Sequence, residues 1–160
     1  MAKRLGKLEE VGNAVEEAKA TGKFLEVELE REEIERRRFA VKLKDREVKV
    51  NLLGQRLEDG DVVRVEDYLL LVRQKEELAV AIKLGDPTSA FKAGFVIGNL
   101  HLRVMQGEGV VYVPTSEYDA SFLLERLKEF QPRLEKVRFR PNLEAFQVVV
   151  KVEPKGLPAL

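Results

Sequence analysis

The strongest constraint on the fold is a change of hydrophobic pattern near residue 74. Between residues 24 and 73, apolar side chains recur at every second position, as at Phe39, Val41 and Leu43. This alternation is typical of strands with one buried face, and Asp59-Gly60-Asp61 is a strong turn signal between two such strands. We therefore predict a small all-β N-terminal domain over residues 1–73, in which Val11, Val15 and Ala18 could form a short helical face.

After residue 74 the pattern alternates between strands and helices. Val80, Ile82 and Leu84 predict a strand, and the run from Gly85 to Ser89, with its proline and capping side chains, predicts the start of a helix. The apolar positions predicted along this helix include Phe91, Phe95 and Gly98. Gly98-Asn99 is predicted to end it, because both residues tolerate left-handed backbone geometry.

The remaining elements complete a recognisable order. We predict strands near 100–105 and 110–113, a helix capped by Thr115-Ser116 and stopped by Pro132, and a strand around Val137 and Phe139. The order β-α-β-β-α-β predicts a ferredoxin-like domain over residues 74–146, and hence an α+β chain. Residues 147–160 form a C-terminal tail without histidine, whose apolar residues suit packing as an additional edge strand.

Charge and composition exclude several classes of protein. The 28 basic and 28 acidic residues give a net charge of +0, without the basic excess of most nucleic-acid or acidic-membrane binders. The chain has no cysteine, which excludes disulfides and thiolate metal sites. No apolar run suits a membrane span or a secretion signal, so we expect a cytoplasmic protein.

The only histidine is His101, directly after the predicted end of the first helix of the second domain. We find no nucleophile arrangement or phosphate-binding glycine loop, and therefore expect no enzyme. Imidazole is a good ligand for nickel, copper or zinc, but a closed site needs three or four ligands, so His101 would need a second copy or a partner. The simpler interpretation is that His101 interacts with the carbonyl groups at the helix end.

The segment Gly94-Phe95-Val96-Ile97-Gly98-Asn99-Leu100-His101 resembles the signature of the UreE family, the nickel metallochaperones of urease maturation. Further similar segments are Leu57–Val62, Asp86-Pro87, Tyr112-Val113-Pro114, Tyr118-Asp119 and Phe139–Phe146. The resemblance implies a homodimer joined through the second domain, in which His101 of each chain holds one Ni²⁺. It also implies delivery of nickel to urease in complex with its GTPase and scaffold accessory proteins, and an N-terminal β domain that binds a peptide or partner.

Some family features are missing from this sequence. Neither the segment Tyr118–Ala120 nor residues 147–160 contain a histidine, so the resemblance implies about one metal per dimer, with Cu²⁺ or Zn²⁺ as alternative ions in vitro. Glu108, Glu117 and Asp119 could supply only weak oxygen ligands. Leu102 and Arg103 replace the small residues or proline usual after the histidine.

A scaffold without metal is the alternative. In that interpretation the two domains dock on a protein or RNA partner, and His101 merely caps a helix. Tyr112 is the one aromatic residue on the predicted central strands and the charge is balanced, so RNA is the weaker version of this alternative. We therefore expect neither nucleic acid nor membrane as a partner.

Overall fold

The computed structural model describes residues 2–144 and divides the chain into two compact units, residues 1–76 and 77–160. Helices and strands occur in both units, which confirms the mixed α+β class. The predicted boundary between residues 73 and 74 falls inside a strand. The observed boundary in the sequence lies three residues later, between residues 76 and 77. The predicted tail, residues 147–160, lies outside the described residues. Among the described helices, none has the length and apolar character needed to cross a membrane.

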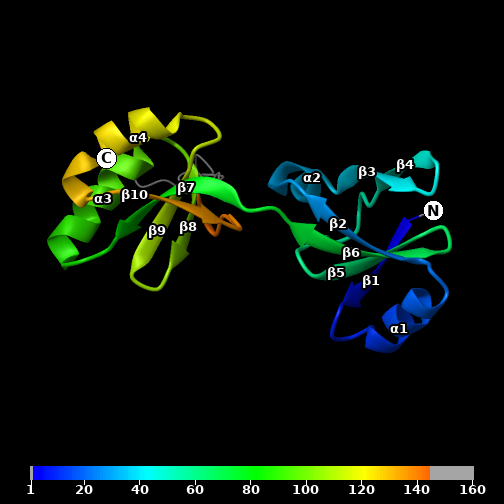
Figure 1. Cartoon of the computed structure of the whole chain (residues 1–160). Coiled ribbons are helices and arrows are strands. Elements are labelled where there is room, and N and C mark those ends of the chain that lie inside the picture. The colour runs from blue at the N-terminus through cyan, green and yellow to red at the C-terminus, as the bar shows by residue number, and fades with distance from the viewer. Residues whose placement is uncertain (1, 145–160) are drawn as a thin grey trace, which may run out of the picture. The chain divides into compact units, whose positions relative to one another are not determined.

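The first unit contains two helices, so the prediction of an all-β domain is wrong. Its elements are β1 (Ala2–Lys7), α1 (Gly12–Ala20), β2 (Phe24–Leu29), α2 (Arg31–Arg36), β3 (Arg38–Leu43), β4 (Arg46–Asn51), β5 (Asp61–Val65) and β6 (Tyr68–Gln74). One sheet has the order β1-β5-β6-β2, in which β2 runs parallel to β6, and β3 and β4 form a separate antiparallel hairpin (Figure 1).

The four-stranded sheet of this unit is covered on both faces. Val15 and Ala18 of α1 pack on one face, against Val62 and Leu71, which confirms the predicted helical face. The other face of the sheet packs against α2 and the β3–β4 hairpin; the buried residues shared there include Ile34, Phe39, Val41, Val50, Val63, Leu70 and Val72. The central strands β5 and β6 therefore bury residues on both sides, and the sheet forms the middle layer.

A buried carboxylate fixes the turn before β5. The Asp61 side chain is 0% exposed, and its Oδ1 lies 3.0 Å from Arg4 Nη2 and 3.3 Å from Lys7 Nζ. Its Oδ2 accepts a hydrogen bond of 2.7 Å from the backbone N–H of Glu58. Two cations and one amide thus compensate the charge that burial would otherwise make costly. Asp61 therefore joins β1 to the turn that leads into β5.

Glu58 makes the stability of this unit sensitive to acid. Its Oε2 lies 3.2 Å from Arg56 Nη2 and 3.1 Å from Lys7 Nζ. Hydrogen bonds from Arg56 and then Lys7 lower the pKa of Glu58 from 4.5 to about 2. Because the pKa is depressed in the folded state, this contribution is fully present above about pH 4.5 and is lost as the pH falls towards about 2.

We expect Glu58→Gln to lose less stability between about pH 6 and about pH 3 than the wild type does, because the amide does not titrate. Urea unfolding followed by circular dichroism at the two pH values measures the difference. An equal acid-dependent loss in both proteins would show that Glu58 does not supply it.

The second unit follows the order strand, helix, strand, strand, helix, strand. Its elements are β7 (Glu77–Lys83), α3 (Pro87–Gly98), β8 (Arg103–Gly107), β9 (Val110–Pro114), α4 (Ala120–Arg126), the 3-10 turn η1 (Lys128–Phe130), β10 (Arg133–Val137) and the short β11 (Leu143–Glu144). The antiparallel sheet has the order β10-β7-β9-β8-β11, with α3 and α4 on the same side of it (Figure 1). Its core joins Ile97 and Leu123 of the helices to Val80 and Val113 of the strands.

The first predicted helix start in this unit is correct and the second is wrong. Pro87 opens α3, and the Asp86 carboxylate accepts a hydrogen bond of 2.9 Å from Ser89 N–H, as the sequence predicts. The later helix begins at Ala120 rather than at Thr115-Ser116, because Asp119 is its N-cap. Thr115 instead donates its hydroxyl to the carbonyl oxygen of Leu78, at 2.8 Å.

Candidate metal centre

His101 lies on the turn that joins α3 to β8. The N–H of Leu100 donates to Ile97 O at 3.0 Å, and the N–H of His101 donates to Gly98 O at 3.2 Å. Leu100 and Leu102 are both buried, whereas His101 is exposed. Two apolar anchors therefore hold the turn on the core, with the histidine between them at the surface.

The left-handed residue of this turn is His101 itself. Its φ is 56°, whereas Asn99 has a φ of −68° and is right-handed. The predicted helix end at Gly98-Asn99 is confirmed, because α3 ends at Gly98 with Asn99 as its C-cap, but this cap is not left-handed. The left-handed residue therefore lies three positions after Gly98, the last residue of α3. A left-handed backbone costs a residue other than glycine about 1 kcal/mol. Arg37, Lys44, Glu66 and Gln131 have a similar positive φ, between 54° and 57°, so this conformation alone does not distinguish the histidine.

Tyr118 connects this turn to the start of α4. Its hydroxyl donates to the carbonyl oxygen of Leu100 at 3.3 Å, directly before the histidine. Its ring stacks on Phe122, with the two ring centroids 5.2 Å apart. The position of the turn therefore depends on α4 as well as on α3.

The acidic residues near this turn do not form a ligand set with His101. Asp119 accepts hydrogen bonds from Phe122 N–H at 2.8 Å and from the Ser121 hydroxyl at 2.9 Å, and these bonds lower the pKa of Asp119. One of its oxygens is thus committed to capping α4. Within residues 2–144, no three His, Cys, Asp or Glu side chains are placed to hold a metal together, and the predicted weak ligands Glu108 and Glu117 do not alter this.

An exposed aromatic stripe lies on α3. Phe91 and Phe95 are 74% and 63% exposed, so they do not belong to the core, whereas Ala93 and Ile97 are buried. The two rings are one helical turn apart and therefore lie on the same face. The two rings form an exposed apolar patch, which is a candidate contact surface for another molecule. The apolar pattern of the sequence predicted the helix but did not distinguish this outer face from the buried one.

Comparisons with protein-family models and with curated proteins identify no relative that bears on this site. No protein-family model matches the chain, and a comparison with curated proteins finds no match.

Proposed function

We propose that this protein is a nickel metallochaperone of urease maturation that holds one Ni²⁺ between two copies of His101. The observation that carries the proposal is an exposed histidine in a left-handed turn, at the end of a helix with an exposed aromatic stripe. The stripe would supply a contact surface, and the turn after the same helix carries one exposed imidazole. A two-fold axis near His101 would bring two identical side chains together, because the same patch of both subunits meets in such a dimer.

One imidazole ligand per chain suits a metal ion that must be released to a recipient protein. Two histidines leave most coordination positions of Ni²⁺ to water or to ligands of the recipient protein, so the metal can be transferred without breaking a closed cage. Imidazole also accepts Cu²⁺ and Zn²⁺, which would compete in vitro. The partial negative charge at the end of α3 favours a cation nearby. No catalytic step is required, and the protein acts as a carrier rather than an enzyme.

The fold is consistent with this proposal. We infer that the second unit is a ferredoxin-like domain, because β10, β7, β9 and β8 give the strand order 4-1-3-2 with two helices on one side. This domain would form the homodimer and bind the metal. The first unit would be the partner-binding domain that contacts urease or its GTPase and scaffold accessory proteins in the cytoplasm.

The aromatic stripe provides the test of the dimer. The double variant Phe91→Glu/Phe95→Glu is expected to be monomeric in sedimentation, because it places two carboxylates where each copy would bury two rings. Its nickel affinity is expected to fall by roughly tenfold or more, since each monomer retains one imidazole. The variant Lys92→Glu changes an exposed residue of the same helix outside the stripe and is the control. A dimer that persists in the double variant would contradict the proposed interface.

A protein-interaction scaffold without metal remains the second candidate, and the β3–β4 hairpin favours it. Arg38, Lys42 and Lys49 are exposed on its outer face, and Glu47 is opposite Lys42. A basic face on a chain of zero net charge suits an acidic protein partner. Wild-type protein without measurable nickel affinity would favour this candidate over the metallochaperone.

A further inference from the structure

The β3–β4 hairpin turns a polar face away from the core of the first unit. Phe39 is buried on its inner side, whereas the residues on either side of Phe39 are exposed. Arg38 lies opposite Asn51, and Ala40 lies opposite Lys49, so these four side chains share the outer face. The two opposite pairs are two residues apart along each strand, which separates them by about 7 Å.

A shallow depression of about 490 Å³ lies on this outer face, lined by Arg38, Ala40, Lys49 and Asn51 among others. Ala40 has only a methyl group, so space remains between its longer cationic neighbours. Within residues 2–144, Lys49 forms no ion pair. An open space between two cations attracts an anionic group.

Positive charge is concentrated at one end of the hairpin. Residues 38–51 contain five basic and two acidic residues, in a chain of zero net charge. One of the two acidic residues, Glu47, is exposed opposite Lys42, nearer the hairpin turn than the depression is. The other end of the outer face, around Arg38 and Lys49, is therefore the more strongly basic one.

An exposed leucine extends this basic end. Leu53 is 60% exposed, and its backbone N–H donates to the Asn51 side-chain oxygen at 2.9 Å. Leu53 therefore follows directly where the outer face ends at Asn51. A ligand that carries only negative charge would leave this apolar side chain in water, whereas a segment with an apolar residue beside its carboxylates would cover it.

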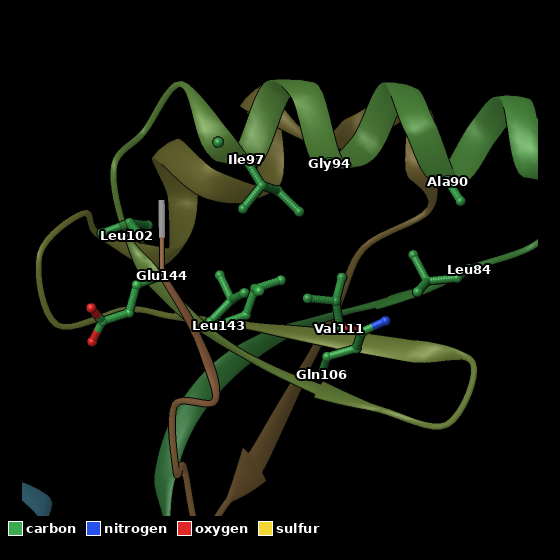
Figure 2. A pocket seen from close by; sticks show the side chains of 11 residues that line it. Leu84, Ala90, Gly94, Ile97, Leu102, Gln106, Val111, Leu143 and Glu144 are labelled. Atoms are coloured by element: carbon green, nitrogen blue, oxygen red, sulfur yellow. The ribbon is translucent and has the colours of Figure 1, made fainter. Parts of the chain in front are cut away.

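The cavity of the second unit has the opposite character. Figure 2 shows this space of about 410 Å³ between α3 and the sheet, with Ile97 and Val111 on its walls and Glu144 at one end. The charged group of this lining is a carboxylate, which repels an anionic ligand. Of the two surfaces, the outer face of the hairpin is the one that fits an acidic segment.

We propose that the outer face of the β3–β4 hairpin binds an extended acidic segment of a partner protein, with the pattern acidic-x-acidic-x-apolar. The first, third and fifth residues of an extended chain point to the same side, about 7 Å apart. The first carboxylate meets Lys49, the second meets Arg38, and the apolar side chain covers Leu53. This inference rests on the partner-binding role that both candidate functions give to the first unit, and it requires no nickel.

A protein segment fits this face better than RNA does. Single-stranded RNA is recognised largely by stacking its bases on exposed aromatic side chains. The aromatic residue of the hairpin is Phe39, which is buried on the opposite face. The outer face thus offers cations and an apolar side chain, but no ring on which a base could stack.

A labelled peptide that contains Glu-Ser-Glu-Ser-Leu tests the proposal by fluorescence anisotropy with the full chain at about 0.15 M salt, where distant charges are screened. Arg38→Glu/Lys49→Glu is expected to bind it at least roughly tenfold more weakly, because two attractive contacts become repulsive. Lys3→Glu/Arg64→Glu is the matched control, since it reverses two exposed, opposite cations on β1 and β5 of the same unit. This control is expected to keep the wild-type affinity.

Two further measurements separate recognition from misfolding. The charge-swapped peptide Lys-Ser-Lys-Ser-Leu is expected to bind Arg38→Glu/Lys49→Glu more tightly than it binds the wild type, which a misfolded variant would not do. Leu53→Ser is expected to weaken binding of the acidic peptide by roughly fivefold, because the apolar contact is lost.

Equal weakening in the two double variants would overturn the proposal, as would the absence of saturable binding to the wild type up to about 1 mM peptide. Tighter binding of a single-stranded RNA of the same length would also overturn it and would assign the face to nucleic acid. His101→Asn is expected to bind the acidic peptide as the wild type does, so a failure of the nickel proposal is distinguished from a failure of this one.

Discussion

Replacing His101 with asparagine is expected to abolish tight nickel binding and to leave the fold unchanged. Asparagine tolerates the left-handed backbone of this turn, so the variant removes the imidazole with little backbone strain. The nickel affinity is expected to fall by at least roughly 100-fold, because even the loss of a group that only orients a metal ligand costs about 10- to 100-fold. Isothermal titration calorimetry with Ni²⁺ measures the change, and circular dichroism confirms the fold.

His101→Gly separates the metal function from the backbone effect. Glycine adopts the left-handed conformation without steric cost, so this variant is expected to gain up to about 1 kcal/mol in its free energy of unfolding. It should nevertheless lose nickel binding as the asparagine variant does. Wild-type affinity in either variant would show that another group binds the metal, and His101 would then be only a residue of the turn.

Replacing Asp61 with alanine is expected to destabilise the first unit by about 3 kcal/mol or more, because it leaves two cations of a partly buried cluster without their shared carboxylate. Asp61 bonds to Arg4 and to the Glu58 N–H and lies 3.3 Å from Lys7, so three contacts are lost together. The change in the midpoint of urea unfolding, followed by circular dichroism, measures the loss.

An exposed ion pair of the same unit supplies the control for Asp61. Asp67 lies 3.1 Å from Lys23 Nζ, but its side chain is 66% exposed. Asp67→Ala is expected to shift the midpoint of urea unfolding far less than Asp61→Ala does, because exposed pairs contribute little. A similar loss in both variants would show that burial of Asp61 does not determine its contribution.

Strong periodicity and strong caps made part of the fold predictable. Strand β2 coincides with the alternating run Phe24–Leu29, and α3 begins where Asp86 and Pro87 predict it. Helix α2 was not predicted because Ile34 is its one buried residue, so six residues show no apolar period. The mutual hydrogen bonds of Glu30 and Glu33 at its start are a capping box, which was the available signal.

Strand β1 was missed for a different reason. Its sequence contains three basic residues and Gly6, and the strand is stabilised by pairing with β5 far along the chain. The local sequence pattern carries no information about such a long-range contact. At the candidate site, the sequence identified His101 but not its left-handed backbone, because Gly98 and Asn99 are intrinsically better suited to that conformation.

The proposed function requires one metal ion to be shared by two identical chains through His101. Native mass spectrometry of the nickel-loaded protein measures the number of chains and the number of ions in the same particle. We expect a species of two chains and one Ni²⁺, and no nickel-bound species for His101→Asn at the same concentrations. A dominant species with one Ni²⁺ on a single chain would contradict metal sharing through His101.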